Sequence, residues 1–250
     1  MNLRYLLILL LLSTCKLLDS GIAWGTPTPP TFAPERSVYI QGVIQRNNLE
    51  PLGVRILELA DTKTLPGDRQ PIDIIINSPG GEVYSGLRFL NYMREVTSRG
   101  YTMRCFVGHM AASLAFQILL YCNQRFALSG SILLWHRVRA FYRGAITAPA
   151  ARDIALALQR IDNYFEYDLF HVMTEMPKAL IKYHREHETM HIAKALSAEM
   201  PQFIQTYDNI PNLLEADKMS QVLTSRMPFI FGDIDIQDPE ILYIYKNRKE

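Results

Sequence analysis

A serine in a turn of small residues is the first candidate for chemistry in this sequence. Ser113 ends residues 108–113, which have the sequence Gly-His-Met-Ala-Ala-Ser. The apolar run Tyr101 to Val107 precedes the turn and predicts a buried strand, and the apolar run from Ala115 to Cys122 predicts a buried helix. A serine at a helix start has an exposed hydroxyl beside an unpaired backbone N–H, which is what acyl transfer requires. The same position also suits a serine that only caps the helix.

A histidine and a glycine turn supply the other groups that a serine nucleophile needs. His136 follows the apolar run Ile132 to Trp135, which predicts a strand, and it is a candidate base for the serine proton. Gly81 ends an Asn-Ser-Pro-Gly-Gly turn, so its N–H and that of Leu114 are candidate oxyanion donors. The alternatives are a strand-end histidine and a plain turn, each with a purely structural role.

Strands and helices alternate through the first half of the chain. This alternation predicts an α/β fold with a mainly parallel sheet. In such sheets ligands bind at the carboxyl ends of the strands, which is where Gly81, Ser113 and His136 stand. The predicted strands cover residues 37–44, 72–76, 101–107, 125–128 and 132–135, and the predicted helices cover 50–59, 83–97 and 115–122.

Two further helices are predicted in the second half. The first is long, from its cap Thr147 to about Thr174, with apolar residues at intervals of three and four. Pro177 ends this pattern, and the second helix runs from Lys178 to about Met200. Beyond Pro201 the periodicity is lost, except for a short strand predicted within residues 227–236.

Four motifs occur in an order that resembles the proteolytic subunit of the Clp proteases, within the ClpP/crotonase superfamily. They are Asn-Ser-Pro-Gly-Gly at 77–81, the serine turn at 108–113, Arg-Phe-Ala-Leu at 125–128 and the apolar strand that ends at His136. The resemblance covers residues 36–200. It implies stacked ββα units with a mainly parallel sheet and a long handle helix that builds an oligomer.

The resemblance also implies roles for individual residues. Ser113 corresponds to the nucleophile, His136 to the base, and Gly81 and Leu114 to the oxyanion hole, with no cofactor. The family's third catalytic member is an acid that follows the handle helix, and Glu188 is the nearest acid to that place.

The sequence departs from the family at two further places. The nucleophile turn has one extra residue, since His109-Met110 stands where the family has a single residue, and we expect His109 to be exposed to water. Residues 201–250 have no counterpart in the family and form an extension of unknown role.

Two other functions compete with the serine peptidase. The first is a non-catalytic scaffold that keeps the fold and assembles without a complete triad. The second is a zinc peptidase, because His187, Glu188 and His191 form an H-E-x-x-H motif that would place two imidazoles on one helix face. No other metal or cofactor signal is present in the sequence.

The N-terminus predicts export. Residues 1–25 have the features of a signal peptide, with Arg4 before the short apolar run Tyr5 to Leu12, and residues 26–35 form a proline-rich tether. Cleavage is expected either near residue 25 or before Cys15, which would then carry a lipid and attach the protein to a membrane. The expected location is the bacterial periplasm.

An exported protein permits a disulfide, but for Cys105 and Cys122 we expect free buried thiols.

The net charge and a group of aromatic residues indicate which partners the protein binds. The net charge of +1 gives no indication of nucleic-acid binding. The resemblance to the Clp proteases implies that the substrate is a peptide or an unfolded protein. Tyr164, Tyr167 and Phe170 come close together on the long helix and point away from its apolar stripe. A soluble monomer rarely exposes such a patch, and we therefore expect a homo-oligomer through these residues unless the C-terminal fifty residues cover them.

Overall fold

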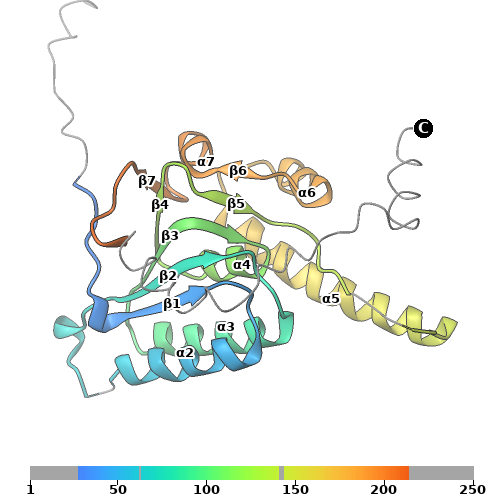
Figure 1. The fold of residues 1–250 in the computed structure, drawn as a ribbon, viewed down its shortest axis with the longest axis horizontal. Helices are drawn as coiled ribbons and strands as arrows, with labels where there is room; N and C mark the ends of the chain where they lie inside the picture. The colour runs from blue at the N-terminus through green and yellow to red at the C-terminus, as the bar shows by residue number, and fades with distance from the viewer. Residues whose placement is uncertain (1–27, 62, 141–143, 214–250) are drawn as a thin grey trace, which may run out of the picture. The chain divides into compact units, whose positions relative to one another are not determined.

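The computed structural model describes residues 28–61, 63–140 and 144–213 (Figure 1). The compact unit that contains the predicted site begins at Thr31. The predicted signal peptide, Cys15 and the strand within 227–236 lie outside the described residues. Among the residues that are described, no helix is both long and apolar enough to cross a membrane.

The centre of the fold is a seven-stranded, mainly parallel sheet, as predicted. Four strands and a fifth from far along the chain lie side by side in parallel: β1 (Ser37–Gln41), β2 (Ile72–Ser78), β3 (Met103–Ala112), β4 (Gln124–Leu128) and β7 (Gln205–Tyr207). The strand β5 (Ile132–Leu134) pairs in parallel with β3 and antiparallel with β6 (His191–Ile192). The α/β class expected from the alternating pattern is confirmed.

Helices cover the sheet because its strands are apolar on both faces. Figure 1 shows α2 (Arg46–Leu59) and α3 (Val83–Ser98) side by side along one face. The short helix α4 (Leu114–Leu120) is buried at every residue, and its sequence is apolar except for Gln117, whose side-chain amide donates to Asp168 at 2.8 Å. The remaining helices are α5 (Ala148–Val172), α6 (Lys178–His187) and α7 (Ala193–Glu199), with 3₁₀ turns η1 (Pro34–Arg36) and η2 (Pro66–Asp68).

The strand β3 changes its partner halfway along its length. Residues 104–107 pair with β4, whereas residues 110–112 pair with β5. The sequence predicted that this strand ends at Val107, but it continues to Ala112 because β5 gives its second half a partner. The serine turn is therefore shorter than predicted, and Ser113 directly follows a strand.

The long helix α5 forms as predicted, with the Thr147 hydroxyl accepting a hydrogen bond from the Ala150 N–H at 3.4 Å. Its buried residues are Phe165 and Leu169, both in its C-terminal half. Figure 1 shows its N-terminal end extending away from the sheet. The apolar stripe thus packs against the core along only part of the helix.

The predicted helix from Lys178 to Met200 is wrong, because the chain divides it into three elements. Helix α6 ends at His187, and the left-handed backbone of the next residue, Glu188 (φ 51°), reverses the chain direction. The strand β6 and the helix α7 follow. The short strand β7 was also missed, since three residues give no detectable alternation.

The expectation of two free cysteines is wrong as well. Cys105 in β3 and Cys122 after α4 form a disulfide, with their Cα atoms 5.7 Å apart. Helix α4 returns the chain to the start of β3, where Asn123 and Met103 exchange two hydrogen bonds of 2.9 Å. This return brings the two thiols together.

Candidate functional site

One cavity contains every residue predicted for the nucleophile, the base and the oxyanion hole. Gly81, Ser113, Leu114 and His136 all line a cavity of about 240 Å³. Glu188, the predicted third member, does not line it. The structure thus brings four of the five predicted catalytic residues together.

The pairing of β3 with β5 explains how the serine and the histidine meet. Ala112 lies opposite Leu134 at the carboxyl ends of these parallel strands. The pairing extends one residue further, because the Ser113 N–H donates to the Leu134 carbonyl at 2.8 Å. His136 follows two residues after Leu134 and therefore reaches the same end of the sheet.

The backbone of Ser113 has a conformation that non-glycine residues rarely adopt. Its φ is 56° and its ψ is −122°. Such strain persists only where the surrounding structure enforces it, and it is concentrated at functional sites. Ser113 occupies the N-cap position of α4, but its hydroxyl makes no capping hydrogen bond to the helix.

The Gly80-Gly81 turn passes very close to the serine. A Cβ on Gly80 would lie 2.7 Å from both the Ala112 carbonyl oxygen and the Ser113 Cβ. A Cβ on Gly81 would lie 2.2 Å from the Ile44 carbonyl oxygen. Both glycines also have positive φ, 95° and 152°. Only glycine fits here, and this close approach places the Gly81 backbone on the wall of the cavity.

The His136 side chain is held as a neutral imidazole. Its Nδ1 lies 2.5 Å from the Arg137 carbonyl oxygen, and a carbonyl can only accept, so Nδ1 carries the proton and Nε2 keeps its lone pair. Burial lowers the pKa of His136 below its usual 6.5, and the cations Arg139 and Arg185 lower it further. The Arg137 hydrogen bond and Asp162 act in the opposite direction. The imidazole is consequently uncharged near neutral pH.

Two acids contact the residues that follow His136, and no described carboxylate is hydrogen-bonded to its imidazole. Glu188 is half-exposed and forms an ion pair with Arg139. Asp162, on α5, accepts a hydrogen bond of 2.7 Å from the Val138 N–H and so fixes the segment that follows His136. The sequence analysis missed Asp162, whose only signal was an acid beside the apolar stripe of the long helix.

Arg185 is a buried cation at the cavity wall that sequence reasoning also missed. It is 3% exposed and lines the cavity. It donates to Glu166 at 2.6 Å and to Asp162 at 2.7 Å. Its segment reads as a solvated, mixed-charge helix, so the sequence carried no signal for this burial.

The H-E-x-x-H motif does not form a zinc site of the predicted kind. His187 ends α6, Glu188 reverses the chain, and His191 lies in β6. The His187 ring stacks on Tyr183, whereas the His191 ring stacks on Trp135 with centroids 4.5 Å apart. Among the described residues, no group of three or more His, Cys, Asp or Glu side chains is placed to hold a metal ion.

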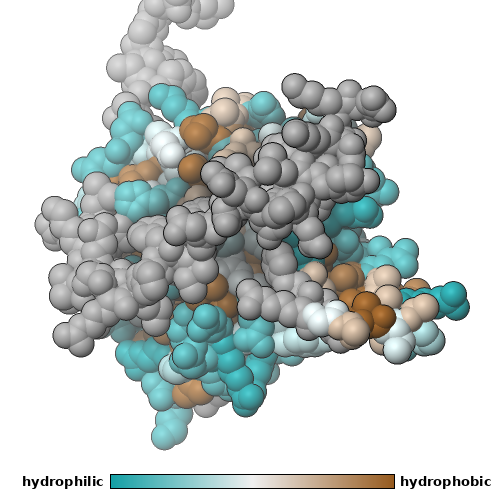
Figure 2. Space-filling model, turned by 45° about the vertical axis from the view of Figure 1, so that its right-hand side comes forward, coloured by the Kyte–Doolittle hydropathy of each residue, from teal (hydrophilic) through white to brown (hydrophobic). Residues whose placement is uncertain are grey.

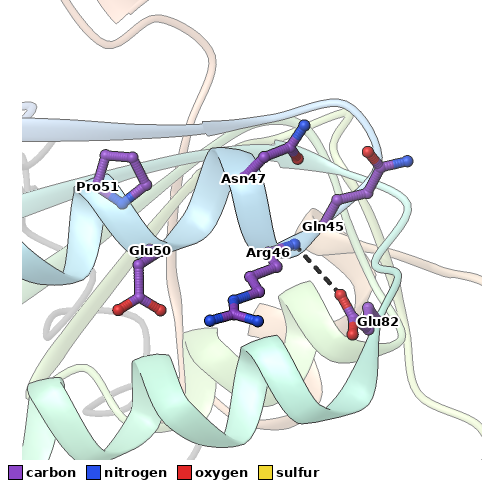
Figure 3. Close-up of a pocket in the computed structure, with 6 residues that line it drawn as sticks. All are labelled: Gln45, Arg46, Asn47, Glu50, Pro51 and Glu82. Atoms are coloured by element: carbon purple, nitrogen blue, oxygen red, sulfur yellow. Dashed lines mark hydrogen bonds between the residues drawn. The ribbon is translucent and has the colours of Figure 1, made fainter.

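A second hollow, of about 620 Å³, lies at the start of α2. Figure 3 shows its lining, with the Arg46 side chain extending between Glu50 and Glu82. The Arg46 N–H also donates to a Glu82 carboxylate oxygen at 3.2 Å. The residues that line this hollow include no serine, cysteine or histidine, so the smaller cavity is the one equipped for nucleophilic chemistry.

His109 lies in the second half of β3 and is exposed, as expected. It does not line the cavity that contains Ser113.

Comparison with known proteins supports the likeness seen in the motifs. No curated protein matches this chain. The family model for Clp protease matches residues 31–197, which is more than half of the chain and includes Gly81, Ser113 and His136. The parallel sheet, the strand-end serine and this match together show that the chain belongs to the Clp protease family.

Proposed function

We propose that the protein is an exported serine peptidase that uses Ser113 as nucleophile and His136 as base. The observation that supports this most strongly is the shared cavity of Ser113, His136, Gly81 and Leu114. Members of the Clp protease family act on peptides, which makes a peptide or an unfolded protein the expected substrate.

The reaction follows from the placement of these groups. His136 Nε2 takes the Ser113 proton as the serine oxygen attacks the peptide carbonyl. The N–H groups of Gly81 and Leu114 stabilise the oxyanion; Leu114 is the first residue of α4, so its N–H has no acceptor within the helix. His136 then gives the proton to the leaving amine, which departs as the acyl ester on Ser113 forms. In the second half of the reaction His136 takes a proton from a water molecule that attacks the ester, and it returns that proton to the Ser113 oxygen as the carboxylic acid product leaves.

In the part of the chain that the structure describes, a backbone carbonyl and not an acid is bonded to the imidazole. The Arg137 carbonyl accepts a hydrogen bond from the Nδ1–H group and fixes the ring tautomer. Asp162 is a positioning residue, because it binds the Val138 N–H two residues further along the same segment. Glu188 acts only at a distance, by offsetting the charge of Arg139.

Two features support export. The N-terminal residues 1–25 resemble a signal peptide, with membrane attachment through a lipidated Cys15 as one outcome of processing. The disulfide between Cys105 and Cys122 is a bond that persists in oxidising compartments such as the periplasm.

Assembly through α5 is also part of the proposal. Members of the family typically form homo-oligomers. Of the three aromatic residues predicted to mediate contact, Tyr167 is exposed, Tyr164 bonds the Tyr121 hydroxyl, and Phe170 lies under Lys178 and Lys182. Figure 2 shows apolar surface on the N-terminal part of α5, and the exposed residues of α5 include Leu156.

The second candidate is the non-catalytic scaffold. One observation favours it: among the described residues, no carboxylate is hydrogen-bonded to His136, whose Nδ1 bonds a backbone carbonyl instead. A scaffold would have the same fold and the same assembly but would not hydrolyse peptides.

Hydrolysis of an unfolded protein such as reduced casein separates the two. We expect cleavage by the wild type and its loss in Ser113→Ala and His136→Ala. Ser98→Ala and His187→Ala are the matched controls, because both side chains are exposed and lie outside the cavity; His187→Ala also removes a ligand of the zinc alternative. Equal cleavage by Ser113→Ala and the wild type would refute the proposal.

A further inference from the structure

We propose that the cavity beside Ser113 contains a subsite for a carboxylate of the peptide substrate, formed by Arg137, Arg139 and Arg185. This inference deepens the proposed function and rests on it, because the ligand is the peptide that Ser113 would attack. It names the class of peptide that the site prefers.

The charged residues around the cavity have one sign. Arg137, Arg139 and Arg185 line it together with His136, and no Asp or Glu among the described residues does so. The acids that pair with these arginines are Asp162, Glu166 and Glu188, and all three lie outside the lining. An anion bound in the cavity would therefore contact the arginines and not the acids that pair with them.

Arg185 carries an unused donor. Its two terminal nitrogens bind Asp162 and Glu166, but its Nε is buried and has no hydrogen-bond partner among the described residues. The residue is 3% exposed, so water offers little compensation for the missing bond. A buried donor without a partner is costly, so a carboxylate that reached the Arg185 guanidinium through the cavity would remove this cost.

Arg137 and Arg139 supply the solvent-exposed part of the subsite. Their side chains are 62% and 47% exposed, and the Arg137 contact with Asp162 is long, at 3.5 Å. Such exposed ion pairs contribute little to stability, so a substrate carboxylate can replace them at low cost. Guanidinium groups bind carboxylates with two parallel hydrogen bonds, which favours this class of ligand.

The cavity volume limits the ligand to a small part of a peptide. About 240 Å³ is less than the ~300–1,000 Å³ of sites that hold drug-sized molecules. One acidic residue beside the scissile bond fits this description, and so does a C-terminal residue with its free carboxylate. Both present the same chemical group, and the experiment distinguishes them.

Equilibrium binding to the Ser113→Ala protein tests the subsite without requiring turnover. The probes are acetylated, amidated alanine pentapeptides with Glu or Gln at each position in turn, and an acetylated alanine pentapeptide with a free or amidated C-terminus. We expect the preferred carboxylate peptide to bind about tenfold more tightly than its neutral partner, and the preference to weaken with added salt. Preference for Glu over Gln identifies a side-chain carboxylate, and preference for free acid over amide identifies the C-terminus.

Charge removal then assigns the preference to the arginines. Arg137→Gln/Arg139→Gln should abolish the discrimination, whereas Arg55→Gln should leave it intact. Arg55 is the matched control, because it is 48% exposed and pairs with Glu58 much as Arg139 pairs with Glu188. Arg137 and Arg139 are exposed, so their substitution leaves the buried ion pairs of Arg185 in place. The inference would be overturned if the two peptides of every pair bound with equal affinity, or if no probe bound measurably. It would also be overturned if the discrimination survived the double substitution. Carboxylate preference in a protein that hydrolyses no casein would retain the subsite while the proposed function fails.

Discussion

Gly80 and Ser113 lie in such close contact that a Cβ on Gly80 would stand 2.7 Å from the Ser113 Cβ. The end of β2 and the turn at Ser113 therefore position each other. The same contact keeps the Gly81 backbone beside the serine, where the oxyanion of the proposed reaction would form.

Gly80→Ala should displace the serine turn. The new methyl group requires the backbone to move, and the positive φ adds strain of about 1–3 kcal/mol. A displacement of this kind should reduce casein hydrolysis by about a hundredfold. Gly67→Ala is the control, since a Cβ there has no neighbour within 4 Å. Equal hydrolysis by both variants would show that the contact has no role in positioning Ser113.

The pH dependence of kcat/KM should show the lowered pKa of His136. The base works only as the neutral imidazole, and burial together with Arg139 and Arg185 favours that form. The acidic limb of the profile should therefore lie below pH 6.5, with activity lost as the pH falls through the pKa of His136. Arg139→Gln removes one cation, so the pKa rises and the limb should move to higher pH. A limb that moves to lower pH, or that moves as far in Arg55→Gln, would contradict this account.

Reduction of the Cys105–Cys122 disulfide should destabilise the protein. The bond joins residues separated by 17 positions, and it closes a loop that contains Ser113. For a loop of this length the expected loss in the free energy of unfolding is about 3 kcal/mol, measurable by urea denaturation with and without reductant. Cys105→Ser/Cys122→Ser should be insensitive to reductant. Non-reducing peptide mapping that recovered both cysteines as free thiols would disprove the bond in solution.

Assembly should depend on the exposed apolar part of α5. Light scattering on the protein without residues 1–25 should give an oligomer mass, and Leu156→Asp should reduce it. Val54→Asp on α2 is the matched control, because the exposures of Leu156 and Val54 are 47% and 46%. A monomer mass for the wild type at micromolar concentration would contradict the oligomer and favour the alternative that the C-terminal residues cover this helix.

The sequence predicted the elements whose signals are local. The apolar run of β2 and the apolar strands that precede Ser113 and His136 could be recognised from neighbouring residues alone. Because the carboxyl ends of parallel strands lie at one edge of the sheet, the site could be expected there. The meeting of these two residues depends on β3 pairing with both β4 and β5, and this switch of partner follows from the folded arrangement.

The residues that were missed depend on long-range packing. Arg185 looks like a surface arginine until α6 packs against α5 and buries it beside Asp162 and Glu166. The change of chain direction at Glu188 could not be predicted either, because no residue type in this charged segment indicates a left-handed backbone. The disulfide was missed because only the return of α4 to β3 brings Cys122 near Cys105.

Labelling with a fluorophosphonate probe, followed by mass-spectrometric mapping of the adduct, tests the central claim most directly. The probe reacts only with a serine whose proton is taken by a base and whose adduct is stabilised by an oxyanion hole. We expect one adduct, on Ser113, that is absent in Ser113→Ala and strongly reduced in His136→Ala. An adduct on another residue, or a folded wild-type protein that does not react, would contradict the assignment of Ser113 as the nucleophile.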